Sequence, residues 1–216
     1  MKKALIVYGG WDGHDPEGVS QVFAEILTAE GFDVTLSDTL DAFRGDLTGY
    51  DLIVPVWTMG QLDDAAERNV CDAVAAGTGI AGCHGGMCDA FRNSTLWQFM
   101  TGSQWVAHPG DGSVTYQVEI CRDTEDPIVA GMEDFTVESE QYYIHVDPAV
   151  KVLATTTFPT VQGLHSANGA VKVPVVYTKL WGKGRVFYNS LGHNRDIFRI
   201  PEARELMRRG FLYASR

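Results

Sequence analysis

Cysteine and long apolar runs are both scarce in this sequence. The four cysteines, Cys71, Cys83, Cys88 and Cys121, show no C-x-x-C spacing. Because no secretion signal accompanies them, we expect free thiols and not a disulfide framework. The apolar run near the N-terminus covers only residues 4–8, which is too short for a signal peptide or a membrane span. These absences predict a cytoplasmic protein without a membrane partner.

Basic residues are also few, and two nucleotide-binding motifs are missing. The chain has 17 Lys and Arg against 28 Asp and Glu, a net charge of −11. A surface this negative repels phosphate backbones, so nucleic acid is not expected as a partner, whereas a small neutral substrate is compatible. The first predicted strand is not followed by G-x-G-x-x-G, and G-x-x-x-x-G-K-[ST] does not occur. Neither a dinucleotide site nor a P-loop is therefore supported.

The first hundred residues alternate between buried-strand patterns and amphipathic-helix patterns. Strands are predicted at residues 3–9, 32–36 and 51–57, and helices at residues 16–30 and 63–76. Such alternation favours a doubly wound, mostly parallel sheet of the flavodoxin-like kind. The length of 216 residues is enough for one α/β domain with its own core. We therefore expect a single domain that covers the whole chain.

After residue 100 the pattern changes to alternating apolar and polar residues, as in strands with one exposed face. Asn168-Gly169 suits a tight hairpin turn. The other elements predicted there are three strands, a hairpin and a closing helix, at residues 114–120, 136–146, 150–157, 173–191 and 201–213. The sequence thus predicts an α/β fold in which antiparallel strands are appended to the parallel sheet.

Residues 79–91 contain the most informative motif. Gly82, His84 and Gly86 form G-x-H-x-G, which has the glycine spacing of a nucleophile elbow. The central residue of an elbow has a strained backbone, at a cost of about 1–3 kcal/mol, and a side chain at the flanking positions would clash. The usual central residue is Ser or Cys, so His84 is the main clue to function. The alternative is a tight strand-to-helix turn without chemistry.

Two other histidines follow predicted strands. His14 comes after the first strand, and His193 comes after the last one. Ligands of doubly wound sheets bind at the carboxyl ends of the strands, so we expect His14, His84 and His193 to face one crevice. His14 and His108 are expected near the rim of this crevice, and His165 on the surface. The alternative for each of them is a hydrogen-bonded structural histidine.

Glu140 lies within the predicted strand 136–146. Alternation of side chains puts Glu140 and Tyr142 on one face of this strand and Tyr143 on the other. One face would thus offer a carboxylate and a phenol together. The alternative is an exposed strand with a solvated glutamate.

Several blocks of the sequence match a known family pattern and together extend over nearly the whole chain. They are residues 82–92, 105–110, 134–137, 140–143 and 174–193. On these blocks the chain resembles the ThuA-like (trehalose utilisation) family of the class I glutamine amidotransferase-like superfamily. It departs from the family at Tyr177, where Trp is frequent, and at Ser139, where Asp is frequent.

The resemblance also shows which amidotransferase residues are missing. Amidotransferases of this superfamily have Cys at the elbow centre, where this chain has His84. They have Glu two residues after the histidine that matches His193, where this chain has Arg195. Cys83 is expected to point away from His84, and Cys88 to lie on the following helix. Because glutamine hydrolysis needs a thiolate and a His–carboxylate pair, we expect no glutaminase activity.

The resemblance implies a role in carbohydrate metabolism, because the family is associated with the use of trehalose and related disaccharides. We expect an enzyme in which His84 and His193 act as base and acid, and Glu140 either orients one of them or shares in the proton transfer. Its substrate would be a disaccharide or a keto derivative. The reaction would be proton abstraction next to a ketone, giving isomerisation or elimination of the glycosidic bond. The residues expected to bind the sugar are His14, Trp57, Gly85, Gly86, His108, Tyr142, Tyr143 and Arg185.

Two alternative functions are compatible with the same residues. The first is a non-catalytic sugar-binding or assembly module that kept the pocket after losing the nucleophile. The second is a metal-dependent hydrolase or isomerase with zinc or a similar divalent ion on His14, His84, Glu140 and His193. Neither H-x-H nor H-E-x-x-H spacing occurs in support of a metal. A homo-oligomer is also compatible with the sequence.

Overall fold

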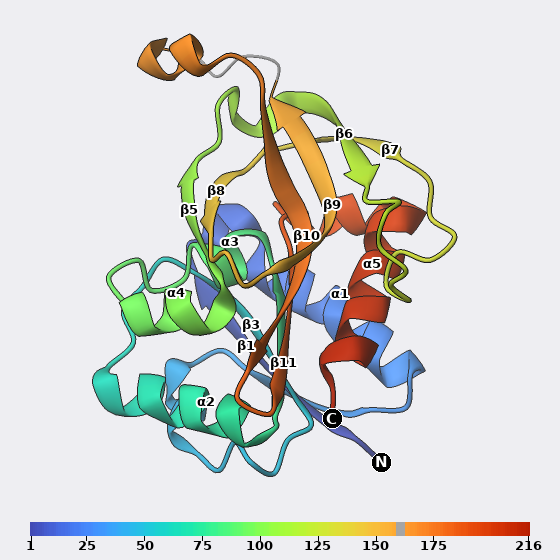
Figure 1. Cartoon of the computed structure of the whole chain (residues 1–216). Helices are drawn as coiled ribbons and strands as arrows, with labels where there is room; N and C mark the ends of the chain where they lie inside the picture. The colour runs from blue at the N-terminus through green and yellow to red at the C-terminus, as the bar shows by residue number, and fades with distance from the viewer. Residues whose placement is uncertain (159–162) are drawn as a thin grey trace.

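The computed structural model describes residues 1–158 and 163–216, and nine strands in these ranges form one sheet (Figure 1). Neighbouring strands run parallel in one half of the sheet, which consists, in order, of β2 (Asp33–Ser37), β1 (Lys3–Gly10), β3 (Leu52–Thr58), β4 (Gly79–Cys83) and β11 (Gly184–Asn189). The other half is antiparallel and continues with β10 (Val171–Trp181), β9 (Lys151–Phe158), β6 (Val114–Ile120) and β7 (Phe135–Ser139). The predicted α/β fold, with antiparallel strands appended to a doubly wound parallel sheet, is confirmed.

Helices cover both faces of the parallel half (Figure 1). On one face lie α1 (Pro16–Ala29) and α5 (Pro201–Ala214), whose Phe23 and Phe211 rings meet at a centroid distance of 5.1 Å. On the other face lie α2 (Asp64–Ala76) and α4 (Thr95–Thr101), with the fully buried Trp97. Because both faces are covered, the strands between them carry continuous apolar runs.

The remaining elements are short. They are α3 (His84–Cys88), the 3-10 turns η1 (Asp12–His14), η2 (Leu40–Arg44), η3 (Asp111–Ser113), η4 (Gly163–Asn168) and η5 (Arg195–Arg199), and a two-stranded sheet of β5 (Ser103–Ala107) and β8 (Tyr143–Val146). In the described part of the chain, every helix is too short or too polar to cross a membrane.

The predicted helix boundaries agree with the structure to within one or two residues because their local signals are strong. Pro16 and Pro201 occupy the first positions of α1 and α5, where a missing N–H group costs little. The Asp63 carboxylate accepts two backbone N–H groups in the first turn of α2. Gly77 ends the same helix with φ +126°.

Two predictions in the second half of the chain are wrong. The predicted strand 136–146 is two strands, because β7 pairs with β6 in the large sheet whereas β8 pairs with β5 in the small one. Residues 140–142, between them, belong to neither strand. Asn168-Gly169 is not a tight turn between adjacent strands, since the turn η4 lies in the β9–β10 connection. Residues 159–162 of that connection lie outside the described residues.

The second predicted hairpin is confirmed and positions the candidate site. β10 and β11 are antiparallel, with Trp181 opposite Gly184 and Gly182 at φ +58° in the turn. β11 then lies parallel to β4, with Asn189 beside Cys83. The residues that follow β11 therefore lie beside the residues that follow β4.

Candidate functional site

The turn from β4 into α3 has the backbone of an elbow. His84 begins α3 with φ +45°, a conformation that costs a non-glycine residue about 1–3 kcal/mol. A Cβ atom on Gly82 would lie 2.8 Å from the Met87 side chain, and one on Gly86 would lie 2.9 Å from the Val56 Cα atom. The glycines are thus needed for the close approach of α3 to β4 and β3.

Gly85 makes room for another histidine. A Cβ atom on Gly85 would lie 2.7 Å from the His14 ring and 3.0 Å from Thr58 Oγ1. Gly85 and Gly86 are both buried. The space that a Cβ atom would need is taken by His14 at Gly85 and by β3 at Gly86. The expectation that these two glycines bind the sugar does not fit their position, since they serve the packing of the elbow.

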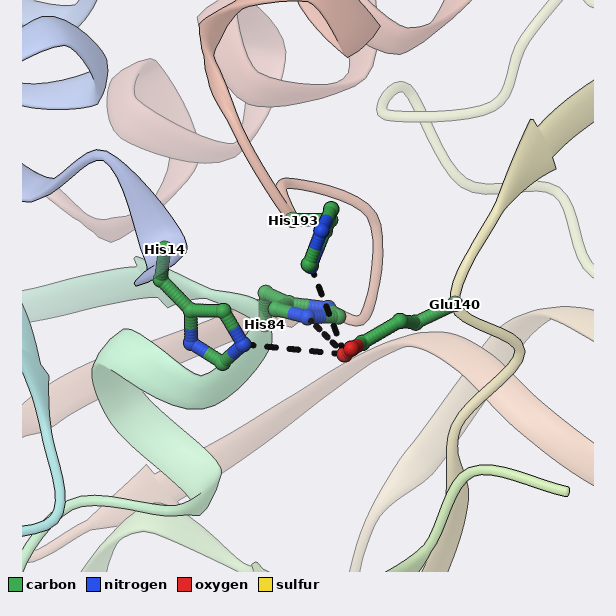
Figure 2. A group of neighbouring side chains, drawn as sticks. All are labelled: His14, His84, Glu140 and His193. Atoms are coloured by element: carbon green, nitrogen blue, oxygen red, sulfur yellow. Dashed lines mark hydrogen bonds and ion pairs between the residues drawn. The ribbon is translucent and has the colours of Figure 1, made fainter. Parts of the chain in front are cut away.

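One carboxylate oxygen lies among four histidine rings. Oε2 of Glu140 is 3.0 Å from His84 Nε2, 3.4 Å from His193 Nδ1, 3.6 Å from His14 Nε2 and 3.8 Å from His108 Nδ1. Figure 2 shows the first three histidines converging on this carboxylate. We call Glu140 and the histidines His14, His84, His108 and His193 the His–Glu cluster.

The members of the His–Glu cluster come from distant parts of the chain. His14 follows β1, His84 follows β4 and His193 follows β11, so all three lie at the carboxyl ends of parallel strands. Glu140 reaches them from the break between β7 and β8 (Figure 2). The crevice expected at this edge of the sheet is thus built by the parallel half and closed by the antiparallel half.

Exposure divides the cluster into a buried floor and an open rim. The side chains of His84, Glu140 and His14 are 1%, 7% and 8% exposed. His14, expected near the rim, therefore belongs to the buried floor. Those of His193 and His108 are 22% and 33% exposed. The expectation that His84 itself touches a substrate does not fit its burial, because Glu140 and Tyr142 cover its ring. His193 and His108 are therefore the members of the cluster that are exposed to solvent.

Two of the buried histidines are oriented by hydrogen bonds from their second ring nitrogen. His84 Nδ1 donates to the Ser190 carbonyl oxygen over 2.8 Å, since a carbonyl can only accept. His14 Nδ1 is 2.8 Å from the Thr58 hydroxyl. With its hydrogen on Nδ1, neutral His84 presents a lone pair at Nε2 toward Glu140.

Burial and neighbouring charges shift the pKa values in the cluster. Burial lowers the pKa of His84 to about 4, which outweighs the opposing effect of Glu140. Burial alone would raise the pKa of Glu140, but the ring nitrogens of His14, His193 and His84 around the carboxylate lower it well below its usual range. At neutral pH, Glu140 is therefore ionised and His84 is neutral.

Other residues expected at the site differ in their positions. Tyr142 stacks on His84 at a centroid distance of 3.7 Å, so it lines the cluster. The Trp57 ring packs against the backbone of Gly9 and Gly60 and not against the cluster histidines. Trp57 thus lies at the correct strand end, but its contacts are structural.

Tyr143 and Arg185 lie away from the cluster. The Tyr143 ring packs on Phe158, and its hydroxyl is 3.2 Å from His165 Nε2. His165, expected on the surface, is consequently half-buried. Arg185 lies at the amino end of β11, the end opposite the cluster, and donates to the Ser215 carbonyl oxygen. A role of Tyr143 or Arg185 in binding the sugar does not fit these contacts.

The sequence analysis missed the residues that support the cluster. Thr58 and Ser190, which bond His14 and His84, were not singled out, although both follow from the rule that ligands bind at strand ends. Trp11, which is 46% exposed, meets the His14 ring at a centroid distance of 4.7 Å. No sequence signal places Trp11 there, because it lies in an irregular loop.

A surface pocket of about 260 Å³ adjoins the open side of the cluster. It is lined by Gly112, Glu138, Ser139, His193, Asn194, Asp196, Ile197 and Ile200. The polar members of this set can form hydrogen bonds with a hydroxylated ligand, and His193 is shared between the pocket and the cluster.

The thiols beside the elbow are not placed as nucleophiles. Cys83 and Cys88 are 1% and 3% exposed, and burial raises the pKa of both. Cys88 Sγ accepts a hydrogen bond from the Tyr188 hydroxyl. Arg195, at the amidotransferase glutamate position, forms an ion pair with Asp15 over 2.6 Å. These contacts are incompatible with a thiolate held by a His–carboxylate pair.

Solved structures with a similar fold come from several bacteria. A ThuA-like protein from Parabacteroides merdae has 19% identity and a TM-score of 0.78, covering 99% of this chain and 89% of its own. A ThuA-like protein from Bacteroides uniformis has 16% identity and a TM-score of 0.75, covering 98% of this chain and 89% of its own. A cytoplasmic protein from Salmonella typhimurium LT2 has 13% identity and a TM-score of 0.68, covering 99% of this chain and 100% of its own. At these identities the likeness concerns the fold alone.

A comparison with protein families gives a match that covers nearly the whole chain. No curated protein matches the sequence. The ThuA family model, described as trehalose utilisation, matches residues 3–214. This chain therefore belongs to the ThuA family.

Proposed function

We propose that this protein is an enzyme that acts on a disaccharide or its keto derivative at the His–Glu cluster. The family description, trehalose utilisation, supports a carbohydrate-related role. The observation that carries the proposal is the position of the Glu140 carboxylate, which lies within 3.8 Å of a ring nitrogen of four histidines. Titratable groups gathered in one crevice are typical of sites for proton transfer.

The reaction proposed is proton transfer at the carbon next to a ketone. A base removes the proton, the electron pair of the C–H bond forms a double bond to the ketone carbon, and the C=O π electrons move onto the ketone oxygen to give an enolate. An isomerisation is complete when the former ketone carbon takes up a proton and the hydroxyl on the deprotonated carbon passes its proton to the former ketone oxygen, so that the ketone has moved by one carbon. If the glycosidic oxygen lies one carbon further along, its C–O bond breaks, and the departing oxygen takes up a proton to complete an elimination. No oxidant or reductant is required in either case.

His193 and His108 are the proposed proton carriers. They are the exposed imidazoles of the cluster, and an imidazole nitrogen can accept and donate a proton. Glu140 holds them through its negative charge, and the buried rings of His84 and His14 lie beside its carboxylate. In this proposal His84 is a positioning residue that acts through Glu140.

The test is turnover on a panel of disaccharides and their 3-keto derivatives. The wild-type protein is expected to convert at least one of them, and Glu140→Gln should lower that turnover by about 10²–10⁴-fold. Glu133→Gln is the matched control, since Glu133 is 80% exposed and its ion-pair partner among the described residues is Arg122. Circular dichroism checks the fold of both variants. Unchanged turnover in Glu140→Gln would overturn the proposal, and tight binding without turnover would favour the sugar-binding module.

A further inference from the structure

Four side chains of the His–Glu cluster each bring one possible ligand atom into the same small space, where three histidine rings face the Glu140 carboxylate (Figure 2). One nitrogen each from His14, His84 and His193 and one oxygen from Glu140 all lie within 4.8 Å of one another. We propose that these four residues hold one divalent cation of the zinc type. The inference deepens the proposed function, because it concerns the same site.

The distances suit such an ion. In a tetrahedral site with bonds of about 2.0–2.1 Å, the ligand atoms lie roughly 3.3 Å apart. Glu140 Oε2 lies 3.0, 3.4 and 3.6 Å from the nitrogens of His84, His193 and His14. Three imidazoles and one carboxylate form a donor set that zinc and neighbouring first-row metals accept. His108 is the more distant and more exposed imidazole, so it is not assigned as a ligand.

The second ring nitrogens support the same assignment. A histidine that binds a metal usually uses its other ring nitrogen in a hydrogen bond, which fixes the tautomer. His84 does so with the Ser190 carbonyl oxygen, which leaves the Nε2 lone pair for an ion. His14 does so with Thr58, which leaves its Nε2 facing the same centre.

The charge around Glu140 also favours a cation. Glu140 is buried, and in the described ranges its ion-pair partners are all histidines. Buried carboxylates are normally paired with a positive charge or bound to a metal. His84 Nδ1 already carries the hydrogen of the neutral ring, so Glu140 Oε2 faces the lone pair of His84 Nε2. Two acceptors at 3.0 Å repel each other unless a positive charge lies between them.

Because the four protein ligands fill a tetrahedral site, a bound ion would polarise the ketone oxygen of the proposed substrate only by expanding to five-coordinate. With His193 engaged as a ligand, His108 would remain as the free imidazole beside the ion. His108 would then carry the proton in the proposed reaction.

The test is metal binding by protein purified without a histidine tag and stripped with a chelator. Titration calorimetry with Zn²⁺ should give one ion per chain, and Co²⁺ should give the intense visible absorption of a tetrahedral complex. His84→Ala and Glu140→Gln should each weaken Zn²⁺ binding by about 10²-fold or more, and Thr58→Val by about 10–100-fold. His145→Ala is the control that should bind Zn²⁺ normally, because His145 is exposed on β8. His108→Ala should also retain the ion.

The outcomes separate the ion from the proposed function. Absence of Zn²⁺ and Co²⁺ binding, or binding that His84→Ala and Glu140→Gln leave unchanged, would overturn the metal assignment even if sugar turnover is found. One bound ion without turnover on any sugar would support the metal assignment and contradict the enzyme. If His84→Ala does not fold, Thr58→Val and Glu140→Gln carry the test.

Discussion

His84 is held at three points before any ligand arrives. Its backbone is fixed by the elbow, its Nδ1 by the Ser190 carbonyl oxygen and its ring face by Tyr142. Nε2 is consequently aimed at Glu140 without a choice of rotamer. Such preorganisation of a buried polar group is expected where charge must be held at a fixed place.

Gly85→Ala should disturb the cluster without changing any of its side chains. The added Cβ would lie 2.7 Å from the His14 ring, so the ring must move. We expect sugar turnover to fall by about 10²-fold, because displacements of about 1 Å have effects of this size. The measurement is turnover beside a thermal melt.

Gly45→Ala is the control for this substitution. A Cβ at Gly45 would be 3.5 Å from the Ala42 carbonyl oxygen, an ordinary contact, and Gly45 is exposed. The control should keep wild-type turnover. Normal turnover in Gly85→Ala would show that the position of His14 does not matter.

The protein should not hydrolyse glutamine. Cys83 and Cys88 are buried thiols whose pKa is raised by burial, and the elbow centre is an imidazole. Coupled detection of ammonia should find no release above the background of the buffer. Ammonia release that Cys83→Ala or Cys88→Ala abolishes would contradict this account.

Local sequence patterns predicted the histidine side of the candidate site but not how Glu140 reaches the histidines. The glycine spacing around His84 indicated the elbow, and strand ends indicated His14 and His193. The predicted strand around Glu140 was wrong, although Glu140 is in the cluster. Its carboxylate reaches the histidines because the chain leaves the large sheet after β7 and joins the small sheet at β8. Which sheet a strand joins depends on tertiary contacts, and the alternation of apolar and polar residues does not predict it.

At the scale of elements, helix ends were more predictable than strand pairing. Proline, aspartate and glycine at the ends of α1, α2 and α5 act through nearby backbone groups, so the signal is local. Strand order depends on contacts between residues far apart. The sequence predicts the hairpin that contains β11, but no local pattern predicts that β11 pairs with β4, the pairing that creates the site.

The helix α5 should make stability depend on pH in acid. Hydrogen bonds from Arg208 lower the pKa of Glu205 to about 2, and Arg209 also donates to this carboxylate. The stabilisation that ionised Glu205 gives the folded state is therefore complete above the usual pKa of 4.5 and is lost as the pH falls toward 2. Because Glu205 is partly exposed, we expect a loss of only about 1 kcal/mol in the free energy of unfolding.

Urea unfolding at about pH 6 and about pH 3 measures this contribution. Glu205→Gln should reduce the difference between the two pH values. Glu25→Gln, an exposed carboxylate on α1, should leave it unchanged. An unaltered difference in Glu205→Gln would show that the arginines do not stabilise the ionised carboxylate.

At the scale of the molecule, we propose that the chain is a single folding domain. Both halves share one sheet, because β11 pairs with β4 on one side and with β10 on the other. The C-terminal Arg216 forms an ion pair with Asp51, which ties the end of the chain to the start of β3. Tryptophan fluorescence and far-ultraviolet circular dichroism should report one coincident urea transition. Two separated transitions would show that the halves unfold independently.

The most direct test of the central claim is hydrogen exchange into a keto-disaccharide in heavy water. The sugar is incubated with the protein in D₂O, and mass spectrometry and proton NMR follow the carbon next to the ketone. If the His–Glu cluster transfers a proton at this carbon, deuterium should enter there with the wild-type protein and with Glu133→Gln, but not with Glu140→Gln. Absence of exchange with the wild-type protein across the panel, or equal exchange with Glu140→Gln, would contradict the account.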